Sequence, residues 1–598
     1  MTTELKEIYT KNIESNLLLL RKISNTNRII SLLRLTIFIL ALIMIYVFAD
    51  HRNIIALIFT IVLAIAAFIF LIKVHTKTFS AKKKYEALIY INQDELEALS
   101  NNFQVFDKGE EFLNPEHPYT FDVDVFGEGS LFQFLNRTAT LIGKQRLADL
   151  LSTSVTDKEA IIRNQMAIDE LSKMINWRQD FQAIGMIHKE KKEDNVRILE
   201  WASEPPLFKN PIYKVLIYLI PALTVFMIVL LSMGILSINL FFLYLVIPWG
   251  IAGSFAAKVN KRHTMVSKTS EMLLKYSLLL NKIETNNFSS RRLKELQEKL
   301  KSQNKSSGKS IKQLYAILSA LDNRLNFVSW ALFNGLLLWD ILQMIRLEQW
   351  QANHQNNMHK WFDAIAEVDS LISLSNYHFN NPDTTFPVLH SSDYIIQANE
   401  LGHPLINKES RVDNDIAIHQ KEFFIITGAN MAGKSTFLRT LVTNMILGMC
   451  GAPVCARQME FNPIRIFTSI RTNDSLLKNE SYFYSELKRL KRIMDELKSG
   501  EMLFVVLDEI LKGTNSRDKH AGSEALLKQF ISLHTSGIVA THDVALGRLA
   551  ETFPENIRNK CFEVEINGNN LTFDYKLREG ISKNMNATIL MKEMGITI

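Results

Sequence analysis

A glycine-rich loop that ends in lysine and serine has the composition of a phosphate-binding site. The stretch FFIITGANMAGKSTFLRTL, residues 423–441, joins an apolar, strand-like run to a helix-like pattern through the loop Gly428–Ser435. Its form, G-x-x-x-x-G-K-S, lets backbone N–H groups surround phosphate oxygens, and the following helix presents its N-terminus to the negative charge. The strand before the loop and the helix after it favour a nucleotide site over a chance match.

The residues of this loop have distinct expected roles. We expect Lys434 to reach the outer phosphates of ATP and the Ser435 hydroxyl to ligate Mg²⁺. The predicted ATP-binding residues are Gly428, Ala429, Asn430, Met431, Ala432, Gly433, Lys434, Ser435 and Thr436.

Two further apolar runs end in residues suited to hydrolysis. The run MLFVVLDEI delivers Asp508 and Glu509 at the carboxyl end of a predicted strand, where a doubly wound sheet binds its ligands. We expect Asp508 to hold Mg²⁺, directly or through water, and Glu509 to polarise the attacking water. The run GIVATHD brings His542 to the same edge, where it can sense the terminal phosphate. The alternatives are a helix cap for the acidic pair and a structural role for the histidine.

Composition limits the remaining possibilities. A chain of 598 residues with 22% charged and 47% hydrophobic residues is expected to form several globular domains, and its net charge of +6 does not by itself indicate nucleic acid. Its three cysteines, Cys450, Cys455 and Cys561, form no Cys-x-x-Cys pair. This argues against a disulfide framework or structural zinc and suits a reducing cytosol.

Four apolar runs are long enough, alone or with their flanks, to cross a bilayer core of about 20 residues. Leu35–Ala49, extended by Ile29–Leu33, and Ile54–Ile72 predict one hairpin, and Val215–Met233 and Ile238–Ala257 predict a second. The alternative is a buried core helix for each run. Basic residues flank both hairpins, so the positive-inside rule predicts an integral protein of the cell membrane with its soluble domains in the cytoplasm. These residues include Arg21, Lys22, Arg28, Lys73, Lys77, Lys82, Lys83, Lys84, Lys209, Lys214, Lys258, Lys261 and Arg262.

A fifth apolar run, FVSWALFNGLLLWDILQMI, begins at Phe327. Asn334, Gly335 and Asp340 interrupt it, so we predict a buried helix face, with a fifth span as the alternative.

The motifs together resemble those of the MutS family of mismatch-repair ATPases, a branch of the ABC-type ATPases. TGANMAGKSTFLRTL is similar to the family's T-G-P-N-M-x-G-K-S-T loop, with Ala429 in place of the usual proline, and LDEILKGTNS and ATHD are similar to its later motifs. LGHPLI and VDNDIAI resemble the segments that enter the family's ATPase domain, and residues 129–151 resemble part of its helical core.

The resemblance implies a homodimer with composite sites. It implies that Ser481, in a segment like the family's S-T-F-x-x-E, contacts the ATP of the other subunit, and that Thr514, Asn515 and Ser516 form a loop between the two sites. It also implies an ATP-driven clamp cycle. The chain departs from the pattern at its N-terminus, where a membrane hairpin is predicted and no F-x-E wedge is found, so the N-terminal mismatch-recognition domain is expected to be absent.

A basic segment, residues 289–313, is the candidate for DNA contacts. Cations on a helix and loop can neutralise phosphates without reading sequence. The alternatives are a solvated helix and a contact with anionic lipid. The possible DNA phosphate contacts are Arg291, Arg292, Lys294, Lys299 and Lys301.

These patterns predict a multidomain chain with an α-helical core, two transmembrane helical hairpins and a C-terminal α/β P-loop ATPase domain of the ABC type. Function is predicted as that of a membrane-anchored, ATP-dependent DNA-binding protein related to mismatch repair. The alternatives are a membrane ATPase acting on a protein or lipid partner and, less favoured, a transporter. The expected divisions are 1–28 (N-terminal cytoplasmic helix), 29–73 (first hairpin), 74–210 (helical core), 211–257 (second hairpin), 258–395 (lever-like part of the core) and 396–598 (ATPase domain).

Overall fold

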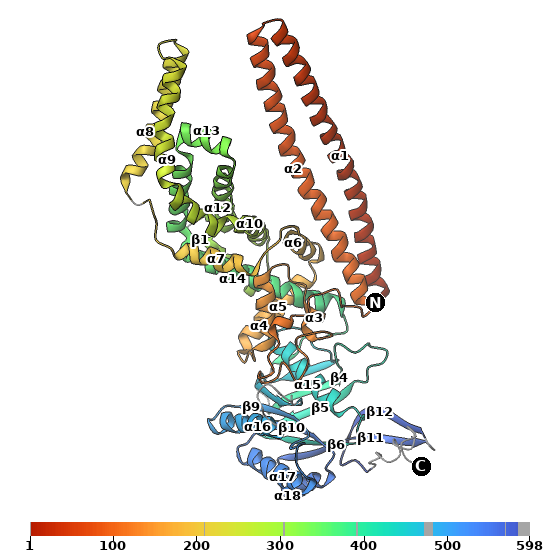
Figure 1. Cartoon of the computed structure of the whole chain (residues 1–598). Helices are drawn as coiled ribbons and strands as arrows, with labels where there is room; N and C mark the ends of the chain where they lie inside the picture. Colours follow the sequence, from red (N-terminus) through yellow and green to blue (C-terminus); the bar gives the residue numbers. More distant parts are fainter. Residues whose placement is uncertain are drawn as a thin grey trace.

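The chain is mostly helical and has several parts, as expected. The computed structural model describes residues 2–208, 210–302, 305–389, 393–471, 482–567 and 570–583. Figure 1 shows two long helical hairpins pointing the same way from a helical core, with an α/β domain at the opposite end of the molecule.

The first hairpin consists of α1 (Thr2–Asp50) and α2 (Ile54–Leu99), which pack against each other along their lengths. Both helices continue well beyond the apolar runs, so the N-terminal helix expected over residues 1–28 is the first part of α1. The second hairpin consists of α8 (Pro211–Ser232) and α9 (Ile238–Val266), each with an internal proline.

Among the described residues, four helices are long and apolar enough to cross a membrane, and they are the helices of these two hairpins. The most apolar 18-residue windows of α1 and α2 are 0% buried, and those of α8 and α9 are 17% and 22% buried. Burial inside the protein therefore does not account for their hydrophobicity, and the alternative of buried core helices is wrong for the first hairpin.

The helical core is organised around α14 (Trp339–Asn380), a helix of 42 residues. Its neighbours come from both halves of the sequence and include both members of the second hairpin. The other core helices are α3 (Leu131–Leu135), α4 (Leu141–Ser152), α5 (Lys158–Ser172), α6 (Ile175–Ile187), α7 (Lys192–Ser203), α10 (Ser270–Glu284), α11 (Arg291–Leu300) and α12 (Ser307–Asp322), with a short ribbon of β1 (Lys301–Ser302) and β2 (Lys305–Ser306).

The prediction of a buried helix face for the run from Phe327 is confirmed for its second half, where Leu338, Ile341 and Met344 are buried, and is wrong for its first half. The run forms a short helix, α13 (Phe327–Leu337), and then bends by 80° into α14. Phe327, Val328 and Leu332 are 77%, 73% and 53% exposed. The polar residue that seemed to interrupt the apolar face, Asn334, is the buried one.

The C-terminal α/β domain is built on a six-stranded sheet in the order β12-β11-β6-β10-β9-β8. All neighbouring strands in it run parallel except β11 and β12. One face of the central strands packs against α15, and the other packs against α16 and α17. A second sheet has the order β3-β7-β4-β5. The elements are β3 (Val388–Leu389), β4 (Tyr394–Leu401), β5 (Asn414–His419), β6 (Phe423–Gly428), α15 (Lys434–Cys450), β7 (Gln458–Phe461), β8 (Arg465–Ser469), α16 (Tyr482–Lys498), β9 (Leu503–Asp508), α17 (Ser516–Ser532), β10 (Ser536–Thr541), α18 (Leu549–Thr552), β11 (Ile557–Asn567) and β12 (Asn570–Glu579).

A buried ion pair fixes the base of the first hairpin to the core. The Arg137 guanidinium donates to Glu95 of α2 at 2.6 Å, and both side chains are buried. Asn376 and Asn380 of α14 donate to the same carboxylate at 2.9 and 2.7 Å, and Tyr9 of α1 donates to Asn380 at 2.6 Å. The carboxylate therefore holds α2, α14 and the segment before α4 together.

Replacing Glu95 with alanine is expected to loosen this joint. The change leaves a buried guanidinium without its anion, which costs about 3–5 kcal/mol. Hydrogen exchange of the purified full chain should show faster exchange at the C-terminal end of α2 and in the segment around Arg137. The control is Glu97→Ala on the same helix, where the carboxylate is exposed; equal exchange in the two variants would contradict the account.

Candidate functional site

The phosphate-type loop follows a buried central strand. β6 lies between β10 and β11 and ends at Gly428, and α15 begins at Lys434. Gly428 has a φ of +154°, and a Cβ atom there would stand 2.7 Å from the carbonyl oxygen of Phe562. Gly433 has a φ of +101° at the start of the helix. The two glycines thus permit the turn that the loop makes.

Lys434 closes this loop through its ammonium group. It donates to the carbonyl oxygens of Gly428 and Ala429, both at 2.8 Å. Burial lowers the pKa of Lys434 to about 8, against the opposing effects of Asp508 and Glu509. The ammonium is partly desolvated and its present partners are neutral carbonyl oxygens. An anion would be a stronger hydrogen-bond acceptor, so the ammonium can exchange these carbonyls for phosphate oxygens.

Ser435 and Asp508, the two residues expected to hold Mg²⁺, lie side by side. The Ser435 hydroxyl donates to Oδ2 of Asp508 at 2.5 Å, joining the start of α15 to the end of β9. A hydroxyl and a carboxylate are hard oxygen ligands of the kind Mg²⁺ takes. No cluster of three or more His, Cys, Asp or Glu able to hold a metal occurs among the described residues. The hydroxyl and the carboxylate fit Mg²⁺, which commonly binds one or two protein oxygens and takes substrate oxygens and water as its other ligands.

Glu509 and His542 also meet at this edge. His542 Nε2 lies 2.7 Å from Oε1 of Glu509, and its Nδ1 lies 2.8 Å from the carbonyl oxygen of Gly428. Lys519 Nζ is 3.7 Å from the other carboxylate oxygen. The hydrogen bond from His542 is the largest cause that lowers the pKa of Glu509 to about 2. Glu509 is therefore an ionised carboxylate throughout the physiological range.

Glu486 holds the loop that follows Glu509. From the sequence, this residue was known only as the glutamate of the segment that resembles S-T-F-x-x-E. Glu486 of α16 is buried and accepts hydrogen bonds from the backbone N–H groups of Leu511 and Lys512 at 2.7 and 3.0 Å. Burial raises the pKa of this carboxyl group above its usual range. The first residue of that motif, Ser481, lies outside the described residues.

The predicted inter-site loop continues from here into α17. Asn515 caps this helix by accepting from the backbone N–H of Asp518 at 2.9 Å. Asn515 and Ser516 are exposed and Thr514 is half-buried. The loop is therefore presented at the surface.

A cavity of about 600 Å³ extends from the loop to residues that the sequence analysis did not assign to a site. His403, Ile406 and Arg411, from the segment between β4 and β5, line it together with Phe562 and Tyr575. Burial lowers the pKa of His403 to about 4, so its ring is neutral at pH 7. The motif LGHPLI, which contains His403, is the sequence feature that could have indicated a role in this cavity. It precedes the loop by more than 20 residues, so the sequence alone did not indicate that the two line the same cavity.

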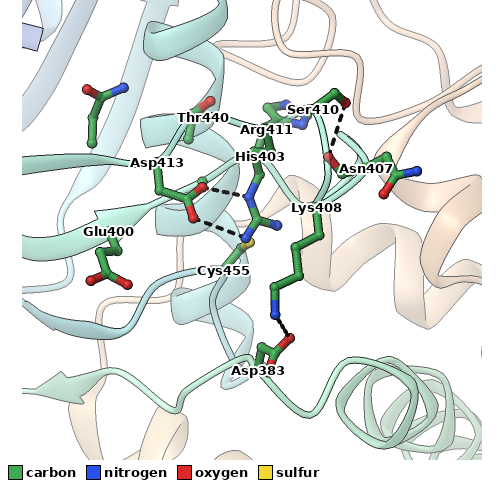
Figure 2. Close-up of polar contacts among 12 residues, drawn as sticks. Asp383, Glu400, His403, Asn407, Lys408, Ser410, Arg411, Asp413, Thr440 and Cys455 are labelled. Atoms are coloured by element: carbon green, nitrogen blue, oxygen red, sulfur yellow. Dashed lines mark hydrogen bonds and ion pairs between the residues drawn. The ribbon is translucent and has the colours of Figure 1, made fainter. Parts of the chain in front are cut away.

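The segment between β4 and β5 is stiffened by ion pairs. Figure 2 shows the Arg411 guanidinium facing Asp413 and the Lys408 ammonium reaching Asp383. The two Arg411 contacts measure 2.6 and 3.3 Å. These pairs hold one wall of the cavity in place.

The basic candidates for DNA contacts divide into two groups. Arg291 pairs with Glu295 at 2.9 Å on α11, and Arg292 pairs with Glu367 of α14 at 3.0 Å. Lys294, Lys299 and Lys301 are exposed, and no ion pair is described for them in this part of the chain. Three of the five predicted residues are therefore available to an anionic partner.

Comparison with known proteins places this site in context. Residues 424–594 match the family model of MutS domain V. The chain is 31% identical over 248 residues to a DNA mismatch repair protein MutS of Thermotoga sp. (strain RQ2), covering 41% of this chain and 30% of that protein. It is 29% identical over 262 residues to the DNA mismatch repair protein MSH3 of Eremothecium gossypii and 28% identical over 244 residues to the MutS protein homolog 4 of Homo sapiens. The MSH3 match covers 41% of this chain and 25% of that protein, and the MutS protein homolog 4 match covers 39% of this chain and 25% of that protein.

These matches show that the C-terminal α/β part of the chain is similar to domain V of MutS proteins. They extend over about two fifths of this chain and less than a third of each relative, so the hairpins and most of the helical core rest on the structure alone.

The low pKa of Lys434 predicts a pH dependence of nucleotide binding. As pH rises through about 8, the empty site loses the ammonium charge that attracts phosphate, so ATP affinity should fall, approaching about tenfold per pH unit well above the pKa. Equilibrium titration with a fluorescent ATP analogue between pH 6.5 and 9.5 measures this. Lys434→Arg, which stays charged, should bind with no such decline, and Lys434→Ala should not bind. A wild-type affinity independent of pH would contradict the assignment.

Replacing Glu486 with alanine is expected to release the loop after Glu509. Two hydrogen bonds to a buried carboxylate are lost, which costs that loop about 3 kcal/mol of local stability. Hydrogen exchange over residues 509–516 should accelerate strongly. Asp495→Ala, an exposed change on the same helix, should leave exchange there as in the wild type; no difference between the variants would refute the role of Glu486.

Proposed function

We propose that the chain is a membrane-anchored MutS-like ATPase that binds and hydrolyses ATP with Mg²⁺. The observation that carries this proposal is the convergence of Lys434, Ser435, Asp508, Glu509 and His542 at one edge of a parallel sheet, on a cavity of about 600 Å³. The cavity lining combines the polar groups of the loop with Ile406, Phe437 and Phe562, which suits a nucleotide with its phosphates on the loop.

The residues of the site suggest how hydrolysis proceeds. Lys434 exchanges its carbonyl partners for the outer phosphates, and the Ser435 hydroxyl and the Asp508 carboxylate hold the metal ion. When bound, Mg²⁺ neutralises charge developing on the phosphate oxygens. Glu509 orients the attacking water, which lies opposite the leaving group in an in-line displacement.

His542 regulates the basicity of Glu509 in this scheme. In the described state its hydrogen bond is the main cause of the low pKa of Glu509, which makes that carboxylate a poor proton acceptor. A terminal phosphate near Gly428 offers His542 a stronger acceptor than the Gly428 carbonyl. Turning of His542 toward the phosphate releases Glu509 and raises its affinity for the proton of water.

Two features of the structure support a dimer and a membrane anchor: the loop Thr514–Ser516 and the common direction of the two hairpins. The exposed loop Thr514–Ser516 supports a homodimer in which Ser481 of one subunit closes on the nucleotide of the other. Both hairpins point away from the α/β domain in the same direction, which supports insertion of both into one membrane with the nucleotide site in the cytoplasm. ATP binding would close the α/β domains of the dimer, and hydrolysis would reopen them.

The partner that this cycle grips is proposed to be DNA. Two features support it: the similarity to mismatch-repair proteins, and the exposed lysines Lys294, Lys299 and Lys301. The alternative, a protein or lipid partner without mismatch recognition, is favoured by the apolar hairpins and by the absence of a predicted F-x-E wedge.

Replacing Glu509 with glutamine tests the hydrolytic assignment. The variant should bind ATP as tightly as the wild type and lose turnover by at least about a hundredfold, because the amide cannot accept a proton from water. Phosphate release and nucleotide binding are measured on the same preparation. Glu551→Gln, an exposed change on α18, is the control. Full hydrolysis by the Glu509 variant would remove Glu509 from the mechanism.

Binding of the full chain in lipid nanodiscs to duplex, mismatched and branched DNA tests the choice of partner. We expect binding that weakens with salt, and a salt dependence that flattens when Lys294, Lys299 and Lys301 are replaced together by glutamine. The same change at the exposed lysines Lys173, Lys189 and Lys498 is the matched control. An absence of binding at low salt, with and without ATP, would favour the protein or lipid partner instead.

A further inference from the structure

The short helix α13 buries its polar residue Asn334 and exposes large apolar side chains. Asn334 is buried, its side-chain oxygen accepting from the backbone N–H of Asp340 at 3.0 Å. Asp340 in turn accepts from Arg324 at 3.1 Å, and both of these charged side chains are almost fully buried. The outward residues Phe327, Val328 and Leu332 are each more than half exposed. A helix facing water has the opposite arrangement.

α13 lies against the second hairpin within the length of its apolar region. Trp249 of α9 donates its indole N–H to the carbonyl oxygen of Ala331 at 2.7 Å, and a Cβ atom at Gly335 would stand 2.7 Å from that indole nitrogen. Ala252 of α9, Ile220 of α8 and Leu338 form one buried apolar cluster. Figure 1 shows α13 beside the hairpin and roughly at right angles to it, away from its turn.

The depth of this contact follows from helix geometry. Trp249 and Ala252 are 11 and 14 residues from Ile238, the first residue of α9, which at the helical rise corresponds to about 16–21 Å from the turn of the hairpin. A bilayer core is about 30 Å thick. If the turn of the hairpin reaches the side of the bilayer core opposite the soluble domains, α13 lies about 9–14 Å inside the core, measured from the side that faces these domains.

A polar layer lies just below this level. Arg324 also donates to Oδ1 of Asn260 at 2.5 Å, and His263 Nε2 lies 2.7 Å from Asp322. Asn260 is 22 residues along α9 from Ile238, which places it about 33 Å from the turn, at the near edge of a bilayer core.

We propose that α13 is an in-plane membrane helix, with its apolar face in contact with the acyl chains of the cytoplasmic leaflet. This inference rests on the proposed insertion of α8 and α9. Lipid is the occupant because the hairpin that α13 packs against also exposes apolar residues near the contact, among them Leu219, Val246 and Ile247. The helix has 11 residues and is about 16 Å long, too short to cross the membrane as a fifth span.

This placement gives the membrane a direct connection to the α/β domain. The chain turns by 80° at Leu338, which has a φ of +48°, and continues as α14. With 42 residues, α14 is about 63 Å long and ends just before β3. A movement of the α/β domain against α14 therefore reaches the leaflet through α13.

Site-directed spin labelling of the full chain in liposomes tests the proposal. Single cysteines replace Val328 and Leu332, and collisions of each label with oxygen, which concentrates in lipid, are compared with collisions with a water-soluble nickel chelate. The three native cysteines are buried, and the labelled wild-type protein gives their background. Two reference positions are Val225→Cys on α8 and Met502→Cys on the α/β domain, at 62% and 79% exposed sites.

We expect the oxygen-to-nickel ratio at Val328 and Leu332 to match that at Val225 and to exceed that at Met502. A ratio like that of Met502 would show a face in water and would overturn the inference. Low access to both reagents, with spin–spin broadening between subunits, would show a face covered by a second copy and would overturn it equally. If the oxygen-to-nickel ratio at Val225 itself is like that at Met502, the hairpin is not in the membrane and the proposed membrane anchor fails as well. The ratio at Val225 therefore separates a failure of the inference about α13 from a failure of the proposed function.

Discussion

The buried polar contacts along α14 are the constraint on which the arrangement of the molecule depends. Near one end, Asp340 binds Arg324 and connects α14 to the elbow with α13. Farther along, Asp369 is fully buried and accepts hydrogen bonds from the backbone and hydroxyl of Thr140 at 2.9 and 2.7 Å, which fixes the start of α4. At the other end, Asn376 and Asn380 share the carboxylate of Glu95 with Arg137. Because a buried polar group without a partner is costly, these contacts allow little sliding of the core helices past α14.

The core is joined to the α/β domain by another set of carboxylates. Asp122 accepts hydrogen bonds from the Thr468 hydroxyl at 2.5 Å and the Arg489 guanidinium at 3.1 Å, and Asp124 pairs with Arg439 of α15 at 2.7 Å. α15 begins at the phosphate-type loop and contacts the core through Arg439. A movement of the loop can therefore be transmitted to the core through this one helix. These contacts provide a physical route by which the proposed nucleotide cycle acts on α14 and, through it, on both hairpins.

The sequence was most informative where local chemistry determines structure. The strands and helix around residues 423–441, and the meeting of Ser435 with Asp508, follow from a loop whose residue types and spacing allow little freedom. His403 was missed as a wall of the cavity because tertiary folding, which local patterns do not encode, brings it there. The interpretation of the run from Phe327 failed over its first half, residues 327–337, for a different reason. Periodicity shows that a helix has an apolar face, but it does not show whether protein or lipid covers that face, and here the polar interruptions turned inward.

We propose that nucleotide binding acts along α14 on the elbow at Leu338. Hydrogen exchange of the Glu509→Gln variant in lipid nanodiscs, with and without ATP, tests it most directly. We expect ATP to protect the loop 428–436 and also to change exchange in residues 320–345, at the far end of α14, a helix about 60 Å long. Protection of the loop with no change at the elbow would contradict the claim.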